Sequence, residues 1–164
     1  MSDEHTFLLQ KVQPAMVGLI DGSLSTLAPI FAVVLASHDT RYAFIAGLAT
    51  SIGAAISMGF SEALSDTGEL TGRGTPLSRG LITGGGTFVG GILHSLPFLI
   101  PQYYTALFFA VVVVAFELLT LAYLRWRFFQ DTFIRALGIV TFAGVAIAAV
   151  AAGLGSLLGT PGGG

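Results

Sequence analysis

Asp21, Met58 and Glu62 are the residues of this chain whose types and spacing could bind a metal ion inside a membrane. Asp21 lies in the otherwise apolar stretch 15–37, and an ionisable side chain at such a depth usually marks a functional site. Met58 and Glu62 are four residues apart, so in a helix they share one face. Carboxylates neutralise charge, and a thioether favours softer divalent ions over Mg²⁺ and Ca²⁺. The combination predicts a site for a divalent transition metal.

The same carboxylates could also carry protons. Removal from water favours the neutral acid, so each carboxylate can exchange a proton for a metal ion. Pro29 has no N–H group and frees the Ser25 carbonyl as a further oxygen ligand. Glu117, a buried acid in a later apolar stretch, is a weaker candidate that either completes the site or relays protons. The alternative for each of these residues is a purely structural role in helix packing.

Membrane-crossing helices must position these side chains. The 164 residues are 54% hydrophobic and 10% charged, with a mean hydropathy of +0.84, whereas about a quarter of the residues of soluble domains are charged. About 20 apolar residues cross a bilayer as a helix. The sequence therefore predicts an all-α membrane protein, one domain with five transmembrane helices at about 15–37, 41–65, 78–99, 103–125 and 133–158.

The two ends of the chain fall outside these spans. Residues 1–14 form a short lead-in, which is either an interfacial helix or a disordered tail. Residues 159–164 are glycine-rich and are expected to form a flexible tail.

The first two predicted helices are joined by a short turn near residues 37–40, so we expect them to lie antiparallel. Asp21 then lies roughly 9 Å from the cytoplasmic end of the first helix, at about 1.5 Å per residue. On the same scale Met58 lies about 10 Å, and Glu62 about 5 Å, from that end of the second helix. The three side chains are therefore expected to converge in the cytoplasmic half of the membrane.

The positive charges predict the orientation of the helices. Arg41 alone lies on one side, and all other basic residues lie in or beside the N-terminal segment and the connections at 66–77 and 126–132. By the positive-inside rule the N-terminus is cytoplasmic and the C-terminus is outside. The six basic residues on the cytoplasmic side are Lys11, Arg73, Arg79, Arg125, Arg127 and Arg135.

Several classes of site can be set aside. The chain has no cysteine, which excludes disulfides and thiolate chemistry, and it has no basic footprint for nucleic acid. His94 and Ser95 are adjacent and would face different sides of a helix, so no hydrolase and no enzyme is expected. His38 and His94 lie toward the outer face, where they either receive a departing metal or are structural.

Glycine is concentrated in the third predicted helix and recurs in the fifth. Gly86 and Gly90 form a small-xxx-small step, which is typical of close helix packing in membranes. We expect these glycine-rich helices to offer contact surfaces for a homodimer.

Three stretches resemble the vacuolar iron transporter family, and most closely the transporter domain of bacterial membrane-bound ferritin. They are QPAMVGLIDGSLSTLAPIFA at 13–32, AAISMGFSEALSDTGELTGRG at 54–74 and FELLTLAYLRWRF at 116–128. The resemblance implies a homodimeric five-helix exporter of Fe²⁺, and also of Mn²⁺, in the bacterial inner membrane, driven by proton antiport. In that family an Asp of the first helix and a Met and a Glu of the second line the path, and these match Asp21, Met58 and Glu62.

Two features depart from the family. Eukaryotic members carry a long Glu-rich insert between the second and third helices, where this chain has only SDTGELTGRGTP at 65–76. The chain also has no Glu-x-x-His pair, so we expect neither a di-iron site nor the ferritin-like domain that carries one. The metal is then a transported substrate rather than a resident cofactor, and a separate ferritin-like protein could be a partner. A proton-coupled exporter of small organic cations and a non-transporting membrane scaffold are the alternatives.

Overall fold

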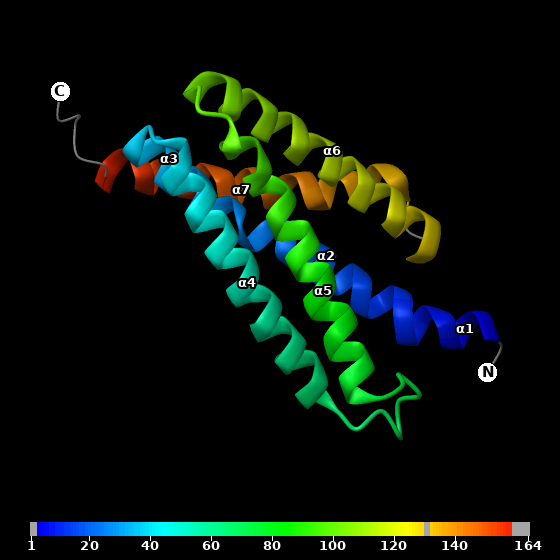
Figure 1. The fold of residues 1–164 in the computed structure, drawn as a ribbon. Coiled ribbons are helices and arrows are strands. Elements are labelled where there is room, and N and C mark those ends of the chain that lie inside the picture. Colours follow the sequence, from blue (N-terminus) through cyan, green and yellow to red (C-terminus); the bar gives the residue numbers. More distant parts are fainter. Residues whose placement is uncertain (1–2, 130–131, 159–164) are drawn as a thin grey trace.

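The computed structural model describes residues 3–129 and 132–158, and this part of the chain is helical without a strand (Figure 1). The all-α prediction is therefore confirmed. The predicted tail at 159–164 lies outside the described residues. The helices are α1 (Asp3–Phe7), the π-helix η1 (Leu8–Val12), α2 (Gln13–Ser25), α3 (Leu27–Ser37), α4 (Thr40–Ser65), α5 (Pro76–Ser95), the 3-10 helix η2 (Leu96–Leu99), α6 (Tyr103–Phe129) and α7 (Phe133–Leu158).

Four helical stretches of the described chain are long and apolar enough to cross a membrane, which is consistent with a multi-pass membrane protein. The helix α5 is not among them, although it occupies most of the third predicted span. Glycine contributes little hydropathy, and α5 also carries Arg79 and His94. The four stretches are Asp3–Ser37, Thr40–Ser65, Tyr103–Phe129 and Phe133–Gly155.

The lead-in and the first predicted span form one nearly continuous helical stretch from α1 to α3. The lead-in is thus helical from Asp3 rather than disordered. The stretch is interrupted at Thr26, one turn before Pro29, whose ring nitrogen cannot donate to the Ser25 carbonyl. The Thr26 hydroxyl instead donates to the Gly22 carbonyl at 2.8 Å.

A tight turn joins α3 to α4, as predicted. His38 adopts a left-handed conformation with φ of 52°, and its N–H donates to the Val34 carbonyl at 2.9 Å. The Asp39 carboxylate then accepts from the Arg41 N–H at 2.8 Å. This hydrogen bond caps the N-terminus of α4, so the second helix returns beside the first.

The helix α5 packs against both α2 and α4 (Figure 1). A Cβ at Gly18 of α2 would overlap the Thr83 carbonyl of α5, and one at Gly80 of α5 would lie 2.6 Å from the Gly59 oxygen of α4. Small residues allow this approach of backbones. These glycines thus pack helices of one chain, as predicted, whereas a Cβ at Gly85 or Gly138 would meet nothing within 4 Å. The homodimer stays a prediction.

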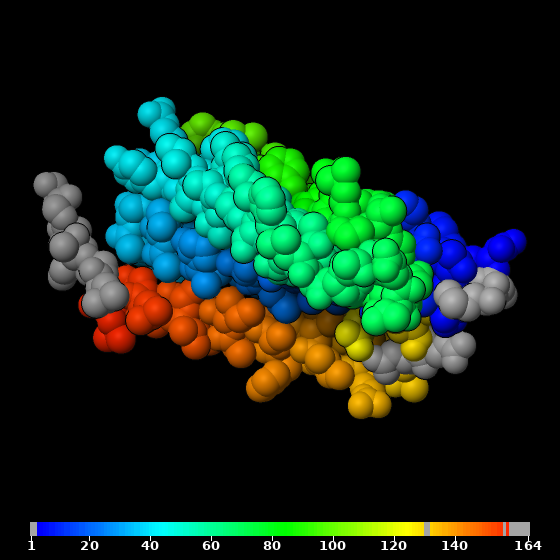
Figure 2. Space-filling view, turned by 90° about the horizontal axis from the view of Figure 1, so that it is seen from below, coloured from blue at the N-terminus to red at the C-terminus, as the bar shows by residue number. Residues whose placement is uncertain are grey.

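The helix α7 packs against α3 and α6. In Figure 2, α7 (orange) lies below the blue first helix, while α4 and α5 (green) lie above it. Two apolar clusters hold these helices together. One contains Ile30, Val34, Ala43, Phe98, Ala106 and Ala110, and the other contains Met16, Leu121 and Val140.

Candidate functional site

Gly91 of α5 marks the place where α2 and α4 come together. A Cβ at Gly91 would lie 2.6 Å from Ser51 Oγ of α4 and 2.8 Å from Cγ2 of Thr26, the residue between α2 and α3. From this level Asp21 lies about five residues along α2, or roughly 8 Å, in the direction of the helix N-terminus. Met58 lies about seven residues along α4, or roughly 10 Å, toward the same end of the molecule. The two side chains are therefore at similar depth, and both are partly exposed.

Glu62 lies one turn beyond Met58 on α4, but its carboxylate is paired with two arginines. Its Oε1 atom is 2.7 Å from Arg73 Nη2 and 3.0 Å from Arg79 Nε. The α1–α2 stretch also diverges from α4 toward this end of the molecule (Figure 1). A metal ion bound to Oε1 of Glu62 would therefore compete with the two guanidinium groups.

Arg79 is a fully buried cation that holds the C-terminus of α4. Its Nη1 donates to Asp66 Oδ1 at 2.9 Å, and its Nη2 donates to Ser65 Oγ and to the Glu62 and Asp66 carbonyls, each at 3.1 Å. The last carbonyls of a helix lack partners within the helix and carry partial negative charge. Arg79 donates hydrogen bonds to these carbonyls and balances their partial negative charge. This explains how a charged side chain with 0% exposure is tolerated.

Asp66 completes an ion cluster with Glu62, Arg73 and Arg79. Its Oδ2 lies 3.3 Å from Arg73 Nη1, so two carboxylates face two guanidinium groups and the formal charges cancel. The hydrogen bond from Arg79, more than any other interaction, holds the pKa of Asp66 below its ordinary value. This pairing explains why Asp66 is ionised beside an apolar helix end.

The connection 66–75 is shaped by glycines around this ion cluster. Gly68 and Gly74 have φ of 81° and 82°, and a Cβ at Gly68 would overlap the Gly74 carbonyl. Gln10 Nε2 donates to the Gly72 carbonyl at 3.1 Å, and this bond ties the connection to the first helix. Sequence reasoning used Arg73 and Arg79 only as markers of orientation. The three acids and two arginines between residues 62 and 79 could have suggested the pairing.

A buried contact between an acid and a histidine joins α5 to α6. His94 Nε2 lies 2.5 Å from Glu117 Oε2, and the two side chains are 3% and 8% exposed. Sequence reasoning placed His94 toward the outer face and gave Glu117 as a weaker candidate for the metal site. They meet because Glu117 lies near the middle of the 27-residue α6, while η2 continues the chain beyond the end of α5. His38, the other candidate near the outer face, packs its ring 5.1 Å from that of Tyr103.

A complete set of metal ligands is not assembled from acids and histidines alone. The described residues contain no group of three or more His, Asp or Glu side chains that could hold a metal ion. One chain therefore offers Asp21 and the Met58 thioether, while Glu62 and Glu117 have cationic or histidine neighbours. The assignment of Asp21, Met58 and Glu62 as metal ligands, with Glu117 as a weaker one, remains a prediction.

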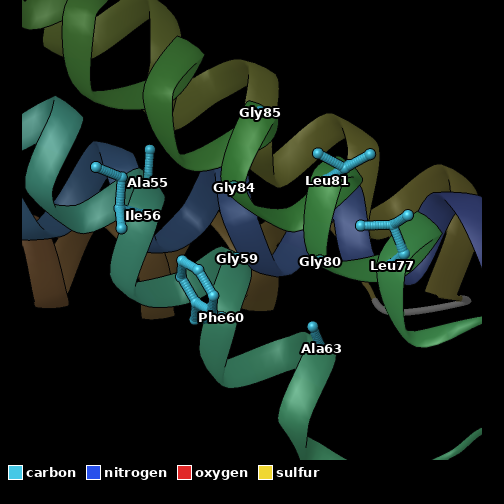
Figure 3. Close-up of a pocket in the computed structure, with 10 residues that line it drawn as sticks. All are labelled: Ala55, Ile56, Gly59, Phe60, Ala63, Leu77, Gly80, Leu81, Gly84 and Gly85. Atoms are coloured by element: carbon cyan, nitrogen blue, oxygen red, sulfur yellow. The ribbon is translucent and has the colours of Figure 1, made fainter.

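The groove between α4 and α5 has a different chemistry. It has a volume of about 480 Å³, and carbon atoms make up almost all of its lining (Figure 3). Phe60 of α4 and Leu77 and Leu81 of α5 form its larger side chains, and glycines form its floor. Such a surface offers no ligand to a cation. The candidate metal residues thus lie outside it.

No protein-family model, curated protein or solved structure matches the chain.

Proposed function

We propose that this chain exports Fe²⁺, and also Mn²⁺, from the cytoplasm in exchange for protons, as a homodimer in the bacterial inner membrane. The observation that carries the proposal is the similar depth of Asp21 and Met58 on two helices that are apolar enough to span a membrane. A carboxylate and a thioether at one depth suit a soft divalent cation. The resemblance to the vacuolar iron transporter family supports the same residues.

The proposed exchange uses the chemistry of Asp21. In an apolar environment the carboxyl group is stable either protonated or bound to a cation. Metal arriving from the cytoplasm would release the proton, and a proton arriving from outside would release the metal. Met58 would disfavour Mg²⁺, which prefers oxygen ligands alone. The proposed orientation has the N-terminus and the ion cluster in the cytoplasm, because most basic residues lie at that end.

The homodimer is proposed because polar groups of the candidate site are incompletely covered in one chain. Ser57 and Ser61 of α4 are exposed beside the partly exposed Met58, and Asp21 is also partly exposed. Hydrocarbon cannot solvate hydroxyl or carboxyl groups. A second copy that covered this face would bring its own carboxylate and thioether, and would thereby supply the ligands that one chain lacks.

The decisive experiment is metal uptake into proteoliposomes under a pH gradient. Wild type is expected to move Fe²⁺ and Mn²⁺ and to move protons in the opposite direction, and Asp21→Asn is expected to abolish both fluxes. Glu69→Gln is the matched control, because it neutralises an exposed acid of the connection 66–75. Equal metal flux in wild type and Asp21→Asn would overturn the site. Absence of any flux in wild type would favour a non-transporting membrane scaffold. Flux of organic cations without metal flux would favour a proton-coupled exporter of small organic cations.

A further inference from the structure

We propose that Arg73 competes with the transported metal for the carboxylate of Glu62, the metal ligand nearest the cytoplasm. The ion pair between Arg73 and Glu62 would thereby set the affinity with which the site binds a divalent metal. This inference rests on the proposed function and adds a residue that regulates it. The contact that carries it is the 2.7 Å distance between Arg73 Nη2 and Glu62 Oε1.

Arg73 and a metal ion would compete for one oxygen atom. Oε1 of Glu62 accepts Arg73 Nη2 at 2.7 Å and already lies 3.0 Å from Arg79 Nε. The Glu62 side chain is only 12% exposed, so water screens these contacts weakly. A metal that binds Oε1 must therefore displace a guanidinium group, and the cost of that displacement lowers its apparent affinity.

The two arginines differ in their freedom to leave. Arg79 is 0% exposed and belongs to α5, and its guanidinium also holds the end of α4. Arg73 is 23% exposed and lies in the connection 66–75, outside any helix. Its neighbours Gly72 and Gly74 both have positive φ, at 68° and 82°, a conformation in which glycine is unstrained. Arg73 is thus the exchangeable partner, and Arg79 is the fixed one.

Departure of Arg73 also changes the charge of the site in the required direction. With Arg73 in place, the ion cluster is formally neutral and holds little attraction for a cation. Without it, Glu62 and Asp66 face Arg79 alone, and the cluster carries one negative charge. A divalent ion can then replace Arg73 with a gain in attraction, because Coulomb energy scales with charge. A monovalent ion gains no such advantage over a guanidinium group.

The test is the dissociation constant of Mn²⁺, measured by its paramagnetic resonance signal on purified protein in detergent. Arg73→Gln is expected to bind Mn²⁺ roughly three- to tenfold more tightly than wild type, the range expected for loss of one partly buried ion pair. Arg73→Lys keeps the charge and should stay within about twofold of wild type. Lys11→Gln is the matched control, because it also removes one positive charge from this end of the molecule. In the described part of the chain Lys11 donates to Ser78 Oγ, at 3.0 Å, and not to Glu62.

Double substitution tests whether Arg73 acts through Glu62. In a Glu62→Gln background, Arg73→Gln should no longer strengthen binding, because the competition has been removed. An unchanged dissociation constant in Arg73→Gln, or an equal effect of Lys11→Gln, would overturn the inference. If Asp21→Asn loses binding while Arg73→Gln resembles wild type, the inference alone fails. If wild type binds no Mn²⁺, the proposed function fails and the inference with it.

A measurement on the unsubstituted protein avoids any effect of substitution on folding. Trypsin cleaves after an exposed arginine, and an engaged side chain is a poor substrate. Saturating Mn²⁺ should release Arg73 from Glu62 and accelerate cleavage between Arg73 and Gly74, with Mg²⁺ as the control ion. A rate that is unchanged or slower with Mn²⁺ would contradict displacement of Arg73.

Discussion

His94 Nε2 of α5 lies 2.5 Å from Glu117 Oε2 of α6, and both side chains are almost fully buried. The pair connects the α4–α5 side of the molecule to the α6–α7 side. Its residues are 23 positions apart in sequence, on helices joined by η2 and the turn that follows it. A buried acid needs a polar partner, and the His94 imidazole is the group that lies beside Glu117.

Separating this pair should destabilise the fold. His94→Gln and Glu117→Gln are each expected to lower the free energy of unfolding by about 1–2 kcal/mol, the upper range for polar contacts between membrane helices. The double variant should lose less than the sum, with a coupling of about 1 kcal/mol, because both substitutions remove the same contact. Thermal unfolding in detergent measures all three variants. Strictly additive losses would show that the two side chains do not stabilise each other.

Backbone contact between α2 and α5 predicts opposite effects for two neighbouring glycines. A Cβ at Gly86 would lie 2.8 Å from the Ala15 carbonyl, whereas a Cβ at Gly85 would meet nothing within 4 Å. Gly86→Ala should therefore separate the helices and lower the melting temperature. Gly85→Ala should be neutral or stabilising by up to about 1 kcal/mol, because alanine favours a helix over glycine. Equal melting temperatures for the two variants would contradict the close approach of α2 and α5.

The positions of the helices were largely predictable, but their neighbours were not. The turn between α3 and α4 follows from the polar residues at 37–40, and the break near Thr26 follows from Pro29. The sequence did not reveal that α5 packs against both α2 and α4. Glycines allow another helix to approach closely, but they do not specify which helix it is. Counting residues from the helix ends gave similar depths for Asp21 and Met58, but it could not show that α5 packs against both of their helices.

The partners of Glu62 depend on a path that sequence patterns do not encode. Arg73 and Arg79 are 11 and 17 residues away from Glu62, too far for a helical pair. They reach it because the connection 66–75 folds back at glycines with positive φ, of which Gly68 and Gly74 are two. Likewise, His94 and Glu117 could be matched only once the lengths of α5 and α6 were known.

The lowered pKa of Asp66 predicts how its contribution to stability varies with pH. Arg79 stabilises the ionised form in the folded state, so the folded pKa lies below the ordinary value of 3.8. The contribution is then complete above that ordinary value and is lost as the pH falls through the folded pKa. Asp66→Asn should melt below wild type at pH 6 to 7, and the difference should shrink below about pH 4. A constant difference down to pH 2 would show that ionisation of Asp66 is irrelevant.

The proposed orientation predicts which connection a reagent outside the cell can reach. The chain has no cysteine, so single-cysteine variants report without background. Leu70→Cys lies in the connection 66–75 and Gln102→Cys at the opposite end of the helices, and both positions are exposed. A membrane-impermeant maleimide should label Gln102→Cys in cells with intact inner membranes. Leu70→Cys should be labelled only after the cells are broken, and the reverse pattern would invert the topology and the proposed direction of transport.

The thioether of Met58 predicts a change of metal preference rather than a loss of folding. Met58→Leu nearly preserves volume, and such a substitution usually costs below about 1.5 kcal/mol, but it removes the only sulfur from the proposed set of ligands. In Met58→Leu, half-maximal transport should require a roughly tenfold higher Fe²⁺ concentration, equivalent to about 1.4 kcal/mol of binding free energy. Mg²⁺ should also inhibit Fe²⁺ transport more strongly than in wild type. Met16→Leu is the matched control, since Met16 is a core residue packed with Leu121 and Val140. If Met58→Leu and Met16→Leu discriminate Fe²⁺ from Mg²⁺ equally well, selectivity resides in oxygen ligands, and Asp21 must achieve it with groups other than sulfur.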